Sequence, residues 1–198
     1  MATGIFCLEG DWYNDFNRSS TVMPGLKLLS QGRDRPLPYV HRDAGTVENL
    51  AFYPRRWSLA EQKRFPMLYL AFHGNPEVVY VGKEEISLDQ IAEMLGEGLT
   101  DRAVHLGCCG TMKADKRSFR KFPHATGMNF ATGFVKDVDR LKSTVFEVPM
   151  FDANFQGVLD QRGNPRIERA VRKEAGHLAR ELGFRMVPRG ARRKIVKD

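Results

Sequence analysis

Cysteine is scarce in this chain, which has only three cysteines among 198 residues, two of them adjacent. Adjacent cysteines cannot build an ordinary disulfide framework, and no second cysteine or histidine pair stands at zinc-ligand spacing. These absences exclude a disulfide-stapled secreted domain and a zinc module. They are typical of a reducing compartment, so we predict a cytoplasmic protein that uses no metal or other cofactor.

Long hydrophobic runs are also missing. No apolar stretch approaches the roughly 20 residues of a membrane-spanning helix, and no leader with a charged start and an apolar core precedes Gly4. We therefore expect neither membrane insertion nor export. The chain has no internal repeats, which excludes a solenoid.

The apolar content of 42% is enough to bury a full core without disulfides. We predict a single domain over residues 1–188, followed by a basic tail over residues 189–198. The tail supplies much of the net charge of +7. Such a tail is usually only solvated, but it leaves nucleic acid or an acidic protein as an alternative partner.

Short apolar runs alternate with helical segments along the chain, which is the pattern of a mostly parallel sheet with crossover helices. We predict an α/β fold with about six strands and helices on both faces. Ser87 and Gln90 form a capping box before one helix, and Pro54 interrupts another between Thr46 and Glu61. The segment from Lys113 to Pro123 has no periodicity and is expected to be a mobile basic loop. The predicted strands cover residues 4–8, 37–41, 67–72, 103–108, 128–135 and 184–187, with a hairpin arm at 78–82.

Two of these strands end on reactive side chains. Residues 67–72 lead into His73 and Gly74, and residues 103–108 end on Cys108 and Cys109. If the two strands are neighbours, their carboxyl ends lie side by side and bring an imidazole to a thiol. That pair is the composition of an activated thiolate nucleophile. The simpler alternative is a solvated histidine and two small buried cysteines.

The order and spacing of these segments resemble the caspase-like cysteine peptidases of clan CD, most closely the bacterial CHAT-type branch. The resemblance implies a three-layer caspase-like sandwich and peptide-bond hydrolysis. It further implies that His73 is the general base, that a cysteine is the nucleophile, and that the amides of Gly74 and of that cysteine bind the oxyanion. The similar segments, between Gly4 and about Gln156, are Ala71-Phe72-His73-Gly74, the helix from Ser87, Val104 to Cys109, Ala131 to Val135, and Asp137 to Phe151.

The nucleophile can be either of two adjacent cysteines. If the family pattern has a small residue directly before the reactive cysteine, the nucleophile is Cys109, because Cys108 is that small residue. If the pattern instead has a glycine two residues after the reactive cysteine, the nucleophile is Cys108, because Gly110 is that glycine. We favour Cys109. Cys7 lies within the first strand, where we expect it to be part of the core.

Among the other histidines, His105 is expected to pack inside a strand, and His41 is the alternative base should His73 fail. His124 and His177 receive no role. No residue can be assigned from sequence as the group that orients His73.

Substrate recognition is expected near the ends of the first two strands, where Glu9, Asp11, Arg42 and Asp43 fall, with Asp15 close by. The carboxylates favour a basic residue before the scissile bond, and Arg42 favours an acidic one. We favour the basic preference because Glu9 and Asp11 directly follow the first strand.

Two functions follow from the sequence. The first is a cysteine endopeptidase with a His/Cys dyad, acting on a protein or peptide, and the resemblance implies a bacterial defence or stress effector that an activating partner or larger assembly switches on. The second is a non-catalytic caspase-like module that binds a protein or nucleic acid through its basic surface. Residues 113–121 contain three Lys and two Arg, and we predict that this segment is the flexible switch for activity.

Overall fold

The computed structural model describes residues 4–12, 20–32, 36–115, 119–156 and 164–190. Six strands form one sheet in the order β2-β1-β3-β7-β8-β9, and β4, β5 and β6 form a small second sheet. Every neighbouring pair in the large sheet is parallel except β8 with β9, which is antiparallel. The strands are β1 (Ile5–Glu9), β2 (Tyr39–Asp43), β3 (Met67–Ala71), β4 (His73–Asn75), β5 (Val78–Val81), β6 (Glu84–Ser87), β7 (Ala103–Leu106), β8 (Phe130–Phe134) and β9 (Phe184–Pro188).

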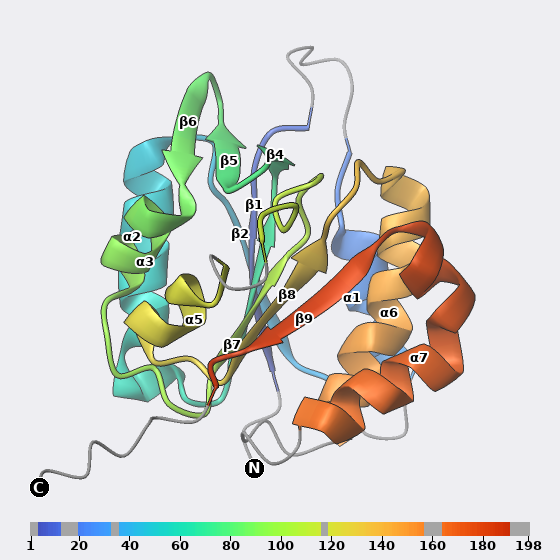
Figure 1. Ribbon diagram of the computed structural model, residues 1–198. Helices are drawn as coiled ribbons and strands as arrows, with labels where there is room; N and C mark the ends of the chain where they lie inside the picture. Colours follow the sequence, from blue (N-terminus) through green and yellow to red (C-terminus); the bar gives the residue numbers. More distant parts are fainter. Residues whose placement is uncertain (1–3, 13–19, 33–35, 116–118, 157–163, 191–198) are drawn as a thin grey trace, which may run out of the picture.

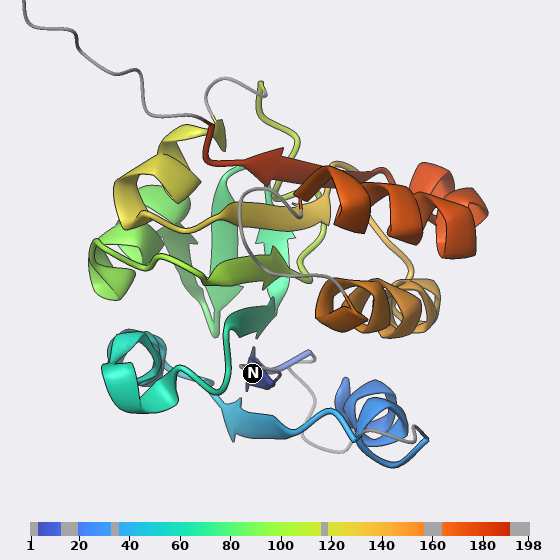
Figure 2. The ribbon, with the colours of Figure 1, turned by 90° about the horizontal axis from the view of Figure 1, so that it is seen from below.

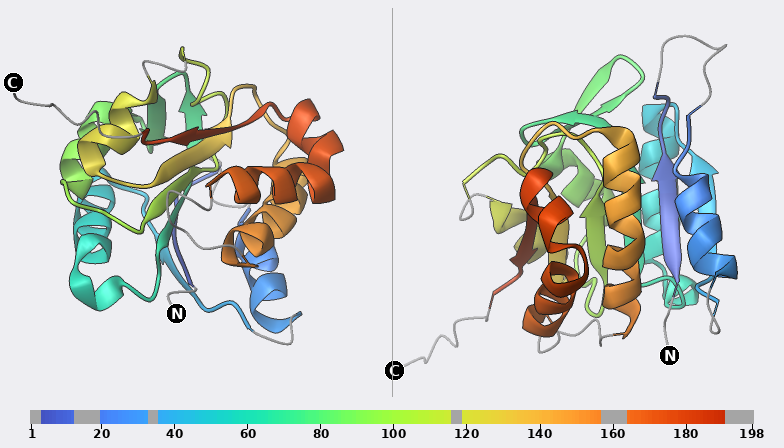
Figure 3. Two further views of the ribbon diagram at one scale, coloured as in Figure 1. Left: turned by 60° about the horizontal axis from the view of Figure 1, so that its bottom comes forward. Right: turned by 90° about the vertical axis from the view of Figure 1, so that its right-hand side faces the viewer.

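Helices cover both faces of the large sheet, as predicted, and give the molecule three layers (Figures 1 and 2). One face carries α2, α3 and α5, and the other carries α1, α6 and α7. Figure 3 (right) shows α1 and α6 side by side. No described helix is long and apolar enough to cross a membrane. The helices are α1 (Met23–Gln31), α2 (Val47–Ser58), α3 (Leu88–Leu95), α5 (Lys121–Thr126), α6 (Arg140–Gln156) and α7 (Asn164–Glu181), with a short 3₁₀ turn, η1 (Ala60–Gln62).

The central strands are buried on both sides, so their residues alternate between two core clusters. In β1, Phe6 and Leu8 pack toward α2 and α3, whereas Ile5 and Cys7 pack toward α1 and α6. Cys7 is fully buried, as expected, and its burial raises the pKa of the thiol well above the usual value. This two-sided burial is why strands β1, β3 and β7 appear in the sequence as short continuous apolar runs.

The helix around Pro54 differs from the prediction. We expected a break near Pro54, but α2 runs without interruption from Val47 to Ser58. Proline removes one helix hydrogen bond. The buried side chains of Leu50 and Trp57 flank Pro54, and the Trp57 indole donates a hydrogen bond of 2.6 Å to the Phe65 carbonyl. Core packing on both sides of the proline therefore holds the helix together.

The basic segment after the cysteines also differs from the prediction of a mobile loop. Phe119 and Phe122 are buried in the core beside α3, and α5 begins at Lys121. The apolar surface that these two phenylalanines bury favours an ordered segment, although the basic residues next to them are exposed at the surface. Residues 116–118, which belong to the predicted switch, lie outside the described residues.

A polar cluster lies inside the core between the sheet and α6. The Tyr69 hydroxyl donates to one carboxylate oxygen of Glu147 at 2.5 Å, and His105 Nε2 lies 3.1 Å from the other. His105 Nδ1 is 2.9 Å from the Thr132 hydroxyl. All four side chains are buried, so these hydrogen bonds satisfy groups that water cannot reach. His105 therefore packs inside the fold, as predicted.

Replacing Tyr69 with Phe tests this cluster. The substitution keeps the ring but leaves one Glu147 oxygen without its donor, so we expect a loss of about 1 to 3 kcal/mol in the free energy of unfolding. Urea unfolding followed by far-UV circular dichroism measures the change. Tyr53→Phe is the control, because Tyr53 is only partly buried in α2. Equal stability of the two variants would contradict the proposed role of the cluster.

Candidate functional site

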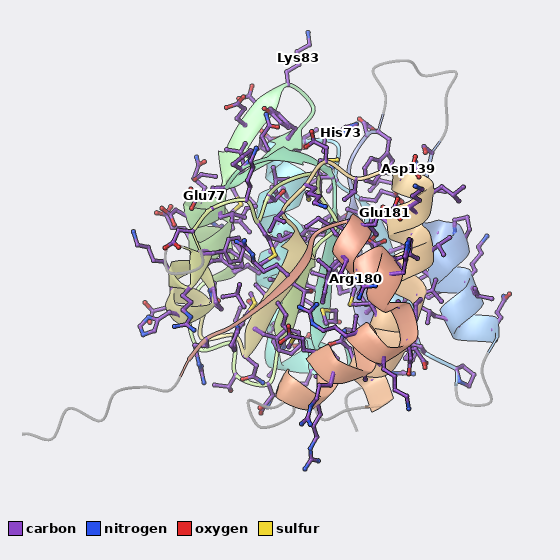
Figure 4. The ribbon with its side chains drawn as sticks, turned by 45° about the vertical axis from the view of Figure 1, so that its right-hand side comes forward. His73, Glu77, Lys83, Asp139, Arg180 and Glu181 are labelled. Carbon is purple, nitrogen blue, oxygen red and sulfur yellow. The ribbon has the colours of Figure 1, made fainter. Side chains whose placement is uncertain are left out.

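The ends of β3 and β7 place the loop that begins with His73 beside the loop that carries the two cysteines. The two strands are parallel neighbours in which Leu70 faces Leu106, and the Gly107 N–H donates to the Leu70 carbonyl at 2.9 Å. His73 and Cys109 each follow this pair by three residues (70 to 73 and 106 to 109). Figure 4 shows His73 at the upper end of the molecule, where these strands finish. The predicted adjacency of the two strands is confirmed.

The loops beyond these strands touch at Gly74. A Cβ atom added to Gly74 would lie 2.8 Å from the Cys108 Cβ and 2.5 Å from the Thr111 hydroxyl oxygen. Distances this short leave no room for a side chain, so a residue larger than glycine would push the two loops apart. Gly74 is buried in β4, which pairs with β5. The absence of a side chain at Gly74 thus allows the loop that begins at His73 to approach the loop that carries Cys108 and Cys109.

Cys108 and Cys109 have different surroundings. Cys108 is fully buried, its Sγ lies 3.4 Å from the Leu70 carbonyl oxygen, and burial raises its pKa to about 12. Cys109 is only partly buried, and its Sγ accepts a hydrogen bond of 3.5 Å from the Val138 N–H. At neutral pH Cys108 therefore stays a neutral thiol inside the core, whereas Cys109 reaches the boundary of the fold. This difference favours Cys109 as the reactive cysteine.

The His73 ring is exposed and held by the loop after β1. Its Nε2 lies 2.7 Å from the Trp12 carbonyl oxygen, and its ring meets the Trp12 ring edge to face at 5.3 Å between centroids. A carbonyl oxygen only accepts, so Nε2 carries the proton in this hydrogen bond. In the neutral ring Nδ1 then keeps its lone pair and can act as a base. Trp12 was not predicted, because a backbone carbonyl leaves no signature in the sequence.

Glu9 is the centre of a hydrogen-bonded group that holds Trp12. One carboxylate oxygen accepts from the Trp12 indole at 2.6 Å and from the Val22 N–H at 2.8 Å. The other accepts from the Thr21 hydroxyl at 2.6 Å and lies 2.7 Å from His41 Nε2. We call Glu9, Trp12, Thr21, Val22 and His41 the Glu9 cluster. The cluster ties the end of β1 to β2 and to the start of α1.

Burial and hydrogen bonding act in opposite directions on Glu9. The side chain is only 4% exposed, and burial alone would raise the pKa of its carboxyl group. The hydrogen bonds from His41, Thr21 and Trp12 stabilise the charged form and bring the pKa below its usual value. Glu9 is thus an internal carboxylate whose oxygens are already used, which leaves them unavailable as a substrate contact. His41, the alternative base, is likewise engaged by Glu9.

The other predicted recognition residues are exposed at the ends of β1 and β2. Asp11 lies against Gly45, where an added Cβ would be 3.1 Å from a carboxylate oxygen. Arg42 donates to the neighbouring His41 carbonyl at 2.7 Å, and Asp43 ends β2. In the strand order β2, which carries Arg42 and Asp43, is three places from β7, and β1, which Asp11 follows, is two places from it. Asp15 lies outside the described residues.

Replacing Glu9 with Gln tests the cluster. An amide NH₂ cannot accept the hydrogen bonds that Thr21 or His41 gives, so we expect a lower melting temperature near neutral pH. Because the folded-state pKa of Glu9 is below the unfolded value of about 4.3, its stabilising effect is complete above that pH and is lost as pH falls through the folded pKa. Thermal melts from pH 7 to pH 3 should show the two proteins converging. A difference that stays constant with pH would refute a role for the ionised carboxylate.

No curated protein matches the chain. Residues 2–187 match a family of unknown function, DUF6642, and the match covers all the elements from β1 through almost the whole of β9. Because the match spans nearly the full chain, the protein belongs to the DUF6642 family.

Proposed function

We propose that this protein is a cysteine endopeptidase in which Cys109 is the nucleophile and His73 the general base. The observation that carries the proposal is the contact of the two loops at Gly74, at the carboxyl ends of adjacent parallel strands. His73 is oriented there by the Trp12 carbonyl, which leaves Nδ1 to accept a proton. The resemblance of the sequence to caspase-like peptidases of the CHAT type supports the same assignment.

The proposed reaction uses these groups in a fixed order. His73 Nδ1 takes the proton of the Cys109 thiol, and the thiolate attacks the carbonyl carbon of the scissile peptide. The backbone amides of Gly74 and Cys109 stabilise the oxyanion that forms. As the C–N bond breaks, His73 returns the proton to the departing amine. Water, deprotonated by His73, then hydrolyses the thioester and releases the free cysteine.

For recognition we propose a basic residue before the scissile bond, with Asp11 as its carboxylate partner. Asp11 is exposed and precedes Trp12, which contacts His73 directly. Glu9 is removed from this role by its burial, and it acts instead by holding Trp12. The Trp12 ring also carries the Arg140 guanidinium 4.9 Å above its centre, which braces the same loop from α6.

We further propose that the protein works in the cytoplasm as a defence or stress effector and that a protein partner activates it. All three cysteines are free thiols, as a reducing compartment requires. The segment that follows Cys109 is held from β9, because the Arg185 guanidinium donates to the Met112 and Ala114 carbonyls at 2.7 Å each. A partner that altered this attachment would act on the loop of the proposed nucleophile.

Substitution of the two cysteines tests the nucleophile. Cys109→Ala should abolish hydrolysis of fluorogenic lysine and arginine peptides, because the other two thiols, Cys7 and Cys108, are buried in the core. Cys108→Ala is the matched control and should retain most of the activity, with a loss of stability from the small cavity it leaves. The reverse result would assign catalysis to Cys108. Unchanged rates in both variants would reject the peptidase proposal.

Replacement of His73 with Ala tests the base without using a substrate. We expect at least a tenfold slower alkylation of Cys109 by iodoacetamide near neutral pH, since the thiolate loses its partner. Mass spectrometry identifies the labelled cysteine, and the melting temperature should barely change because His73 is exposed. His124→Ala, in the exposed part of α5, is the control. A large drop in the melting temperature would instead indicate a structural histidine.

A further inference from the structure

A groove lies between α7 and β9. Its volume is about 390 Å³, and residues of both elements line it. Figure 3 (left) shows β9 at the edge of the sheet with α7 beside it. The groove is separate from the site at His73, because β8 and β7 stand between β9 and β3 in the sheet. Binding in this groove is therefore independent of hydrolysis at the candidate site.

The shape of the groove comes from a bend in α7. Ala175 has non-helical backbone angles (φ −133°, ψ 30°), so the helix consists of two segments joined at a kink. Gly176 follows directly, and glycine weakens a helix. Arg172 from the first segment and Arg180 from the second both line the groove. Both segments of the kinked helix α7 therefore border the groove.

One side of the groove is the outer edge of strand β9. Arg189 N–H donates to the Asn129 carbonyl, and the Gly183 carbonyl accepts from the Val135 N–H. In an antiparallel pair alternate residues face the same neighbour, so Phe184 and Met186 direct their N–H and C=O groups away from β8. No described strand pairs with that outer edge. Phe184 and Met186 both line the groove.

The charges around this edge are mainly positive. The Arg180 side chain is exposed, and the described residues give it no hydrogen-bond or ion-pair partner. Arg172 donates to one carboxylate oxygen of Glu168, which also lines the groove, at 2.9 and 3.2 Å, and such exposed pairs hold weakly. Figure 4 shows Arg180 on the last turn of α7. The Arg180 guanidinium is therefore available to an anionic ligand that lies along β9, and the Arg172 guanidinium becomes available where the ligand's carboxylate replaces that of Glu168.

We propose that this groove binds an extended acidic segment of a partner protein, which adds to β9 as a further strand. The open edge offers donors and acceptors in alternation, which a peptide backbone satisfies completely. A nucleic acid or a free phosphate would use the donors and leave the acceptors unpaired. Carboxylates on the segment would meet Arg172 and Arg180 in the geometry that guanidinium favours.

A second copy of this chain fits the edge less well. Two copies pairing antiparallel about Met186, the middle residue of β9, would set Arg185 opposite Val187 and supply no carboxylate opposite the arginines of this edge. They would also bring the arginines of both α7 helices together. Pro188, which has no N–H, limits the pairing at the far end of the strand. An acidic partner removes the repulsion that a second copy would create.

The test is the fluorescence anisotropy of a labelled peptide of alternating Glu and Val, about seven residues long, with the full chain. We expect saturable binding that Arg180→Glu weakens by about tenfold, a change of about 1.4 kcal/mol. Lys173→Glu makes the same charge change on α7 outside the groove and should leave the affinity nearly unaltered. Circular dichroism of each variant confirms that the fold is kept.

Two further probes separate the proposal from general attraction of anions. A peptide of the same sequence with N-methylated valines keeps its charges but cannot complete the strand, so it should bind at least tenfold more weakly. An oligouridylate of equal charge should compete poorly. The proposal is overturned if the methylated peptide binds equally well, if the oligouridylate competes as effectively as the peptide, or if Lys173→Glu matches the effect of Arg180→Glu.

Discussion

The parallel pairing of β3 with β7 determines where every group of the candidate site lies. Leu70 and Leu106 form the last residue pair of the two strands. Because the strands are parallel, the loops that follow them begin at the same end of the sheet. The glycine after His73 allows the two loops to touch. The site is therefore a property of the sheet register, and a slip of one residue would turn every side chain of a strand to the opposite face.

Two buried glutamates, Glu9 and Glu147, support this end of the sheet in the same manner. Burying a carboxylate is unfavourable unless hydrogen bonds replace its water. Glu9 receives hydrogen bonds from four residues in the loop and strand around it, and Glu147 has Tyr69 and His105. An added Cβ on Gly107 would lie 3.1 Å from a Glu147 oxygen, so this carboxylate sits directly beneath the turn that leads to the cysteines. Hydrogen-bonded polar side chains, and not apolar contacts alone, therefore support the loops.

The sequence was informative where a single segment decides the outcome. The apolar runs of β3 and β7 and the capping box at Ser87 are local signals, and the structure confirms all three. The sequence was less informative where a local structure depends on contacts between several distant segments. Pro54 stays in a helix because Leu50 and Trp57 are buried beside it. The burial of Glu9 needs partners from β2, from α1 and from the loop between β1 and α1, and the role of Trp12 lies in its backbone, which composition cannot show.

The late position of β9 in the sequence affects folding during synthesis. β8 lies between β7 and β9, so its second edge stays unpaired until residues 184–188 leave the ribosome. Two long helices, α6 and α7, are synthesised in the interval. During that time a buried apolar strand exposes one side to other nascent chains, which is the condition under which strands associate wrongly. A stop codon between β8 and β9 would leave the strands at the candidate site complete but give a protein prone to aggregate.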